Sequence, residues 1–142
     1  MNRIAFQVTG YPPAKSDGRS ALVANHPHAA RIHLLLEAAH KAQTVHVFTP
    51  IEREWVRLDV MLFGATEKDP RDALSYLSGI VEALQEKSDL DGINHLGDLG
   101  RIWLFRNSRQ IRHVTYRENE GSRTAYEVSI TDLGDQDRNY ES

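Results

Sequence analysis

The chain has 142 residues, of which 40% are hydrophobic and 26% charged, a composition typical of one folded domain rather than a disordered chain. It contains no cysteine, which excludes disulfides, zinc–thiolate sites and thiol catalysis. The net charge of −3 argues against a protein built mainly to coat nucleic acid. No apolar run approaches the roughly 20 residues of a membrane span, and the first residues resemble a strand rather than a signal peptide. We therefore expect a cytoplasmic protein that does not contact membranes.

The first half of the chain predicts three strands and one long helix. Alternating apolar residues over Arg3–Thr9 predict a strand, and the proline, glycine and serine of residues 10–25 predict a mobile loop. Residues 27–43 form a helical pattern that begins with proline, a residue suited to the first helical position. Residues 45–48 predict a short strand. The alternation over Trp55–Phe63 predicts the clearest strand of the chain.

The second half begins with the clearest helix, which the pattern places over residues 69–87. Asp69 is the expected N-cap, and Asp72 follows at the third helical position. Apolar residues at helical spacing predict its core face: Ala73, Leu74, Leu77, Ile80, Val81 and Leu84. A short helix is expected over 90–99. Three further strands are expected over 102–105, 110–117 and 125–130, with residues 106–109 as a hairpin turn between the first two of them.

These elements predict an α/β fold in the order β-α-β-β-α-(α)-β-β-β. Two main helices against about six strands favour a two-layer domain with a mixed sheet. We expect a single domain over residues 1–131, followed by a flexible acidic tail over 132–142.

Four short segments match a known pattern in the same order: Tyr11-Pro12-Pro13, Arg71-Asp72-Ala73-Leu74-Ser75, Glu82-Ala83-Leu84 and Asn107-Ser108-Arg109-Gln110-Ile111. In these motifs and in element order, over about residues 3–130, the chain resembles the RusA family of Holliday junction resolvases. Members of that family are small homodimers that cut four-way DNA junctions with magnesium. The resemblance implies a RusA-like fold and a homodimer.

The chain departs from the family pattern at its acidic positions. Only Asp72 matches one of the family's carboxylates, and the paired acids before Gln-Ile correspond to Asn107 and Ser108. The remaining acid, the asparagine and the lysine of the helix motif correspond to Leu74, Ser75 and Ser78. Because magnesium prefers several carboxylate oxygens, we expect no cofactor and no junction cutting.

Asp72 has two interpretations, as a helix cap or as a ligand of a rebuilt metal site. In the second, a magnesium-dependent endonuclease would use Asp72 with Asp69, Glu67 and Asp59, and Asp72 would bind the metal. The spacing of His33, Glu37 and His40 on one helical face also admits a transition metal, but partly exposed side chains, or a polar seam against a neighbouring subunit, explain it better.

A basic stretch is the best functional signal, because it carries five arginines and no acid between residues 101 and 117. Arg106, Arg109 and Arg112 are the expected nucleic-acid contacts, together with Lys15 and Arg19 in the first loop. The alternative is a solvated hairpin face balanced by acids elsewhere.

Three functions follow from these signals. The first is a homodimeric binding protein for DNA or another partner, with the RusA scaffold but no nuclease activity. The second is the active nuclease, and the third is a structural homodimer without nucleic acid. The apolar second face of the Trp55–Phe63 strand, with Trp55, Met61 and Phe63, is the expected dimer surface.

Overall fold

The computed structural model describes residues 2–14, 22, 27–66, 72–87 and 91–134. Within these ranges it has four strands: β1 (Arg3–Thr9), β2 (Trp55–Phe63), β3 (Ile111–Asn119) and β4 (Ala125–Gly134). The α-helices are α1 (Ala29–His46) and α2 (Ala73–Leu84), and the 3-10 helices are η1 (Asp91–Arg101) and η2 (Ser108–Gln110). The predicted mixed α/β class is confirmed. None of the described helices is long and apolar enough to cross a membrane.

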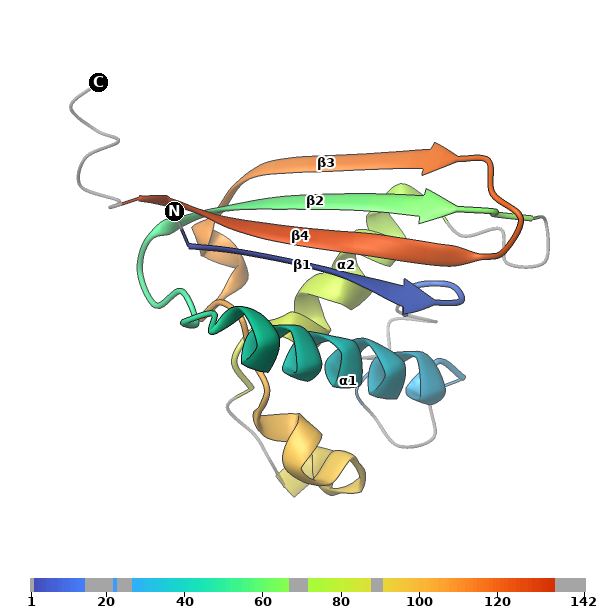
Figure 1. Cartoon of the computed structure of the whole chain (residues 1–142). Coiled ribbons are helices and arrows are strands. Elements are labelled where there is room, and N and C mark those ends of the chain that lie inside the picture. Colours follow the sequence, from blue (N-terminus) through green and yellow to red (C-terminus); the bar gives the residue numbers. More distant parts are fainter. Residues whose placement is uncertain (1, 15–21, 23–26, 67–71, 88–90, 135–142) are drawn as a thin grey trace.

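The four strands form one mixed sheet in the order β1-β4-β2-β3. β4 is antiparallel to both of its neighbours, whereas β2 and β3 run parallel. Both α-helices lie on the same face of the sheet (Figure 1). Alternate residues of the strands point to that face and pack with the helices into one hydrophobic core. No described helix covers the opposite face of the sheet (Figure 1).

Two of the predicted short strands are wrong. Residues 45–48 do not form a strand, because α1 continues through His46 and ends at Val47, whose φ of 51° is left-handed. Phe48 is buried in the core by this turn, not by a sheet. Residues 102–105 also form no strand, since Phe105 makes only isolated bridges to Ile51 and Gln85. A short apolar run therefore does not by itself identify a strand: Val45 and Val47 are exposed here, and Phe48, Leu104 and Phe105 are buried outside the strands.

The predicted hairpin over 102–117 is also wrong. Residues 106–109 do not join two antiparallel strands but lead into η2, and β3 then pairs in parallel with β2. The predicted last strand ends at Ile130, but β4 continues through Gly134, so residues 132–134 belong to the sheet and the predicted tail over 132–142 begins too early. Residues 135–142 lie outside the described residues. The helix expected over 90–99 is present as η1, in the tighter 3-10 form.

α2 begins later and is rotated relative to the sequence prediction. Its N-cap is Asp72, not Asp69, which lies outside the described residues together with Pro70. Leu74, expected in the core, is 75% exposed. Ile80 and Leu84 are buried as predicted, and Leu77 and Val81 pack partly against the core. The prediction missed Tyr76, Gly79 and Ala83, which are also buried.

A contact with the loop after β1 explains this rotation. The ring of Tyr76 stacks on Tyr11 with centroids 6.4 Å apart, and Gly79 packs directly against the Pro13 backbone. Pro12, Pro13 and Ala14 are buried, so the start of the predicted mobile loop is part of the packed structure.

Candidate nucleic-acid interface

An open hollow of about 520 Å³ brings together arginines from two distant parts of the chain. One part is the loop before β2, and the other runs from residue 106 into the start of β3. Four arginines and one glutamate are its charged lining residues: Arg53, Arg106, Arg109, Arg112 and Glu52. The hollow is therefore a basic site on a chain whose net charge is negative.

Buried Gln110 holds the two parts together. Its Oε1 accepts hydrogen bonds from the backbone N–H groups of Arg106 (2.8 Å) and Asn107 (2.9 Å). Its Nε2 donates to the backbone carbonyls of Ile51 and Glu54, both at 3.1 Å. Both N–H groups of the amide are used. Backbone hydrogen bonds from Ile51 N–H to the Leu104 carbonyl (2.9 Å) and from Arg106 N–H to the Ile51 carbonyl (3.1 Å) join the same two segments, so the loop before β2 is held against the turn that carries the arginines by the amide and the backbone together.

Asn107 shapes the turn that presents Arg109. The Asn107 side chain caps η2 by accepting a hydrogen bond from the Arg109 backbone N–H at 3.0 Å. Gln110 bonds back to the Asn107 backbone, which completes a capping box. Arg109 therefore projects from a short turn whose backbone is fixed at both ends.

Arg106 is already neutralised within the chain. Its guanidinium makes ion pairs with Glu52 (3.0 Å) and Glu86 (3.3 Å), and its Cζ lies 5.2 Å from the centre of the Trp103 ring. These contacts link three segments of the fold. Arg106 lines the hollow, as predicted, but its charge is largely compensated there.

The other three arginines keep their charge available. Arg53 and Arg109 are exposed and make no ion pair with any described residue. Arg112 stacks on Trp55, with its Cζ 3.9 Å from the ring centre. Stacking engages the face of a guanidinium and leaves its N–H edge free for an anion. Three cationic groups thus border one open hollow.

The predicted arginine stretch is divided between different surfaces. Arg106, Arg109 and Arg112 converge on the hollow, whereas Arg117 lies on the helix-free face of the sheet beside Asp59. Lys15 and Arg19 lie outside the described residues. Sequence reasoning missed Arg53, because it stands between two glutamates and reaches the site only through contacts between segments distant in sequence.

Asp72 occupies the N-cap of α2. Its Oδ1 accepts a hydrogen bond from the Ser75 backbone N–H at 2.7 Å, and this bond lowers the pKa of the exposed carboxyl. The two acids predicted to join it, Asp69 and Glu67, lie outside the described residues. The capping interpretation therefore accounts for Asp72 by a direct contact.

Asp59 points away from Asp72, because its strand neighbours Leu58 and Val60 face the helices. On the opposite face, burial raises the pKa of Asp59, but hydrogen bonds from Thr115 and Arg57 outweigh it and keep the pKa below its ordinary value. Asp59 and Asp72 therefore cannot bind the same ion.

Two residues of the predicted histidine pattern on α1, His33 and Glu37, form an ion pair in this structure. His33 Nδ1 lies 2.9 Å from Glu37 Oε1, and both side chains are about half exposed. Among the residues that the structure describes, no three histidine, aspartate or glutamate side chains are grouped so that they could hold a metal.

Two comparisons with known proteins found no match. No protein family model matches the chain, and no curated protein matches it significantly.

The role of Asp72 can be tested by comparing alanine and asparagine at this position. Asparagine caps helices about as well as aspartate, so Asp72→Ala is expected to lower the melting temperature more than Asp72→Asn. Magnesium is expected to leave the melting temperature of the parent protein unchanged. A magnesium-dependent rise that both variants abolish would instead identify Asp72 as a metal ligand.

Proposed function

We propose that the chain is a RusA-like protein that binds the DNA phosphate backbone through the arginine hollow and does not cut DNA. One observation carries this proposal: Arg53, Arg109 and Arg112 border one open hollow and form no ion pair with a carboxylate among the described residues. Guanidinium groups match phosphate geometry and bind it through paired N–H donors.

The residues at the acidic positions of the RusA pattern support binding without cutting. Asn107 stands where that pattern has an acid, and its side chain caps η2. Asp72, which does match a family carboxylate, caps α2. Both side chains are used in holding backbone turns, a role that needs no metal.

Contacts to phosphate fit this hollow better than contacts to bases. Trp55 is only 8% exposed, because Arg112 covers its ring, and Arg106 lies over Trp103 in the same way. The aromatic faces nearest the arginines are therefore engaged within the chain and are not free to stack on bases. We accordingly propose binding that is independent of DNA sequence.

The direct test uses a fluorescently labelled four-way junction and a labelled duplex. We expect weak binding to both at about 50 mM salt, measured by anisotropy, because few phosphates are contacted. We also expect the strands to remain intact after incubation with magnesium or manganese. Absence of binding at this salt concentration would refute the proposal. Cleavage would favour the alternative nuclease, and Asp72, Asp69 and Glu67 would be the first residues to replace.

A further inference from the structure

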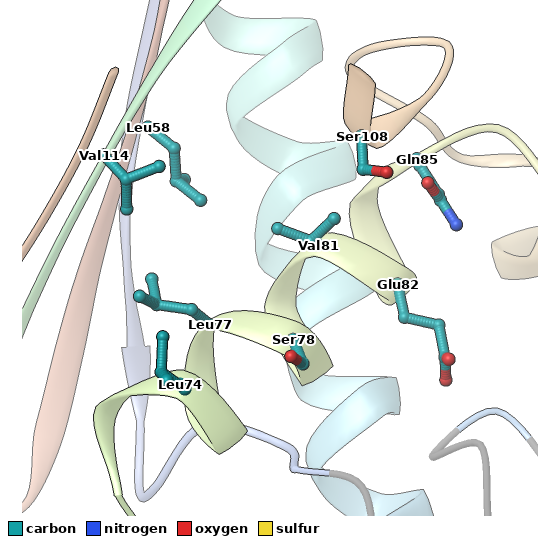
Figure 2. A pocket seen from close by; sticks show the side chains of 9 residues that line it. All are labelled: Leu58, Leu74, Leu77, Ser78, Val81, Glu82, Gln85, Ser108 and Val114. Carbon is teal, nitrogen blue, oxygen red and sulfur yellow. The ribbon is translucent and has the colours of Figure 1, made fainter. Parts of the chain in front are cut away.

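The two faces of the sheet carry hollows of opposite character. On the helix side, an apolar groove of about 450 Å³ lies between α2 and the sheet, with a lining that includes Leu58, Leu74, Leu77, Val81 and Val114 (Figure 2). On the helix-free face, a smaller pocket of about 130 Å³ has residues of all four strands in its lining. Most of these residues are polar or charged, so this sheet-face pocket is suited to a polar ligand.

The floor of the sheet-face pocket is a polar row across three neighbouring strands. Ser129 of β4 lies opposite Asp59 of β2, and Asp59 lies beside Thr115 of β3. The Asp59 carboxylate accepts hydrogen bonds from Thr115 and Arg57. A fixed negative charge therefore lies next to the Ser129 hydroxyl.

The Ser129 hydroxyl has no hydrogen-bond partner among the described residues, although Ser129 is only 5% exposed. Its side chain is directed to the helix-free face, because the neighbouring Val128 and Ile130 belong to the core on the other side. Buried hydroxyls without a partner are rare in folded proteins, and each marks a position where a bound group can supply the missing hydrogen bond. The position of Ser129 in the pocket lining points to a ligand there.

Three exposed charged residues also line the sheet-face pocket, and none of them forms an ion pair with a described residue: Arg3 of β1, Arg117 of β3 and Glu127 of β4. The strand register keeps them apart. Met61 lies between Glu127 and Arg117, and Arg3 pairs with Thr131, four residues along β4 from Glu127. The pocket therefore offers two positive charges and one negative charge to a ligand.

We propose that the sheet-face pocket binds an acidic α-amino acid, aspartate or glutamate. Such a molecule carries two carboxylates and one ammonium, the inverse of the charges of Arg3, Arg117 and Glu127. Guanidinium groups bind carboxylates through paired N–H donors, and the ammonium can donate to Glu127 and to the Ser129 hydroxyl.

The size and charge of the sheet-face pocket exclude other ligand classes. Its volume of about 130 Å³ corresponds to roughly four water molecules of about 30 Å³ each, which is too small for a nucleotide. Asp59 and Glu127 would repel a simple anion, and the arginines would repel a metal ion. A small ligand that carries both signs of charge remains.

This face is more polar than the sequence indicates. Trp55, Met61 and Phe63 are the residues expected from the sequence to form a dimer surface. Met61 and Phe63 are half-buried, and Arg112 covers the ring of Trp55. Met61 shares the lining of the sheet-face pocket with charged residues, so the pocket can admit a charged small molecule.

The test is isothermal titration calorimetry of the parent protein with L-aspartate and L-glutamate at low salt, and it uses no DNA. We expect a Kd of about 1 mM or lower for at least one of them. Succinate lacks the ammonium and alanine lacks the second carboxylate, so each is expected to bind at least about tenfold more weakly. Absence of binding by both acidic amino acids, or equal affinity for succinate or alanine, would overturn the proposal.

Two variants test the residues of the sheet-face pocket. Glu127→Gln is expected to weaken binding of the acidic amino acid roughly tenfold without weakening that of succinate, because it removes the partner of the ammonium. Ser129→Ala is expected to weaken binding while leaving the melting temperature of the free protein unchanged or higher, because it deletes an unsatisfied hydroxyl.

Glu120→Gln is the matched control, because Glu120 is an exposed acid outside the sheet-face pocket, and it is expected to keep the parent's affinity. The parent's affinity in either pocket variant, or an equal loss in the control, would contradict binding at this site.

Discussion

Gly79→Ala is expected to destabilise the protein by about 3 kcal/mol, the upper end of the usual cost of overpacking. A Cβ at this position would overlap the Pro13 carbonyl and lie 2.9 Å from Ala14 Cα. These are backbone atoms of a buried segment, so they cannot move aside as a flexible side chain would. The expectation opposes helix propensity, by which alanine is favoured over glycine by about 1 kcal/mol.

Chemical denaturation of Gly79→Ala and of the control Ser78→Ala measures this effect. Ser78 is the preceding residue of α2 and is exposed, so its replacement should change stability by no more than about 0.5 kcal/mol. A Gly79→Ala variant as stable as the parent would contradict the close packing of α2 on the loop after β1.

Gln110→Leu is expected to cost about 3 kcal/mol, because it removes four hydrogen bonds between the two sides of the hollow. The Asn107 backbone N–H would lose this acceptor, whereas the Arg106 N–H keeps the Ile51 carbonyl, and an unsatisfied buried group costs about 1–3 kcal/mol. DNA binding should weaken with stability, since fewer contacts would hold the loop that carries Arg53 against the turn that carries Arg109.

Gln7→Leu makes the same change at an exposed site on β1 and should alter the free energy of unfolding by no more than about 0.5 kcal/mol. Equal stability of Gln110→Leu and the parent would show that the amide contacts do not hold the hollow together.

Periodicity predicted the elements that have one buried face. Arg3–Thr9 and Trp55–Phe63 match β1 and β2 because alternation reports directly which side of a sheet is buried. Periodicity could not distinguish strands from short apolar runs with other structures: in residues 45–48 only Phe48 is buried, and in residues 102–105 Leu104 and Phe105 are buried without belonging to a strand. It also misplaced Leu74, because Tyr76 and Gly79 contact the loop after β1 and so set which side of α2 is buried.

The candidate site was only partly predictable for a similar reason. Local composition identified the cluster of Arg106, Arg109 and Arg112, which lies within seven residues of sequence. It could not show that Glu52 and Glu86 neutralise Arg106, since these acids come from other parts of the fold. One further signal was available: the spacing of Asn107 and Gln110 is that of a capping box and predicts the turn.

The most direct test of DNA binding at the hollow compares two double variants that remove the same charge. Arg53→Ala with Arg109→Ala removes two of the three arginines at the hollow that have no described carboxylate partner, whereas Arg101→Ala with Arg117→Ala removes two exposed arginines outside it. The measurement is the slope of log affinity against log salt for a labelled duplex. We expect the hollow variant to bind more weakly, with a slope shallower by roughly two units, and the control to match the parent. A hollow variant with the parent's affinity and slope, or a control that loses as much, would contradict binding at this site.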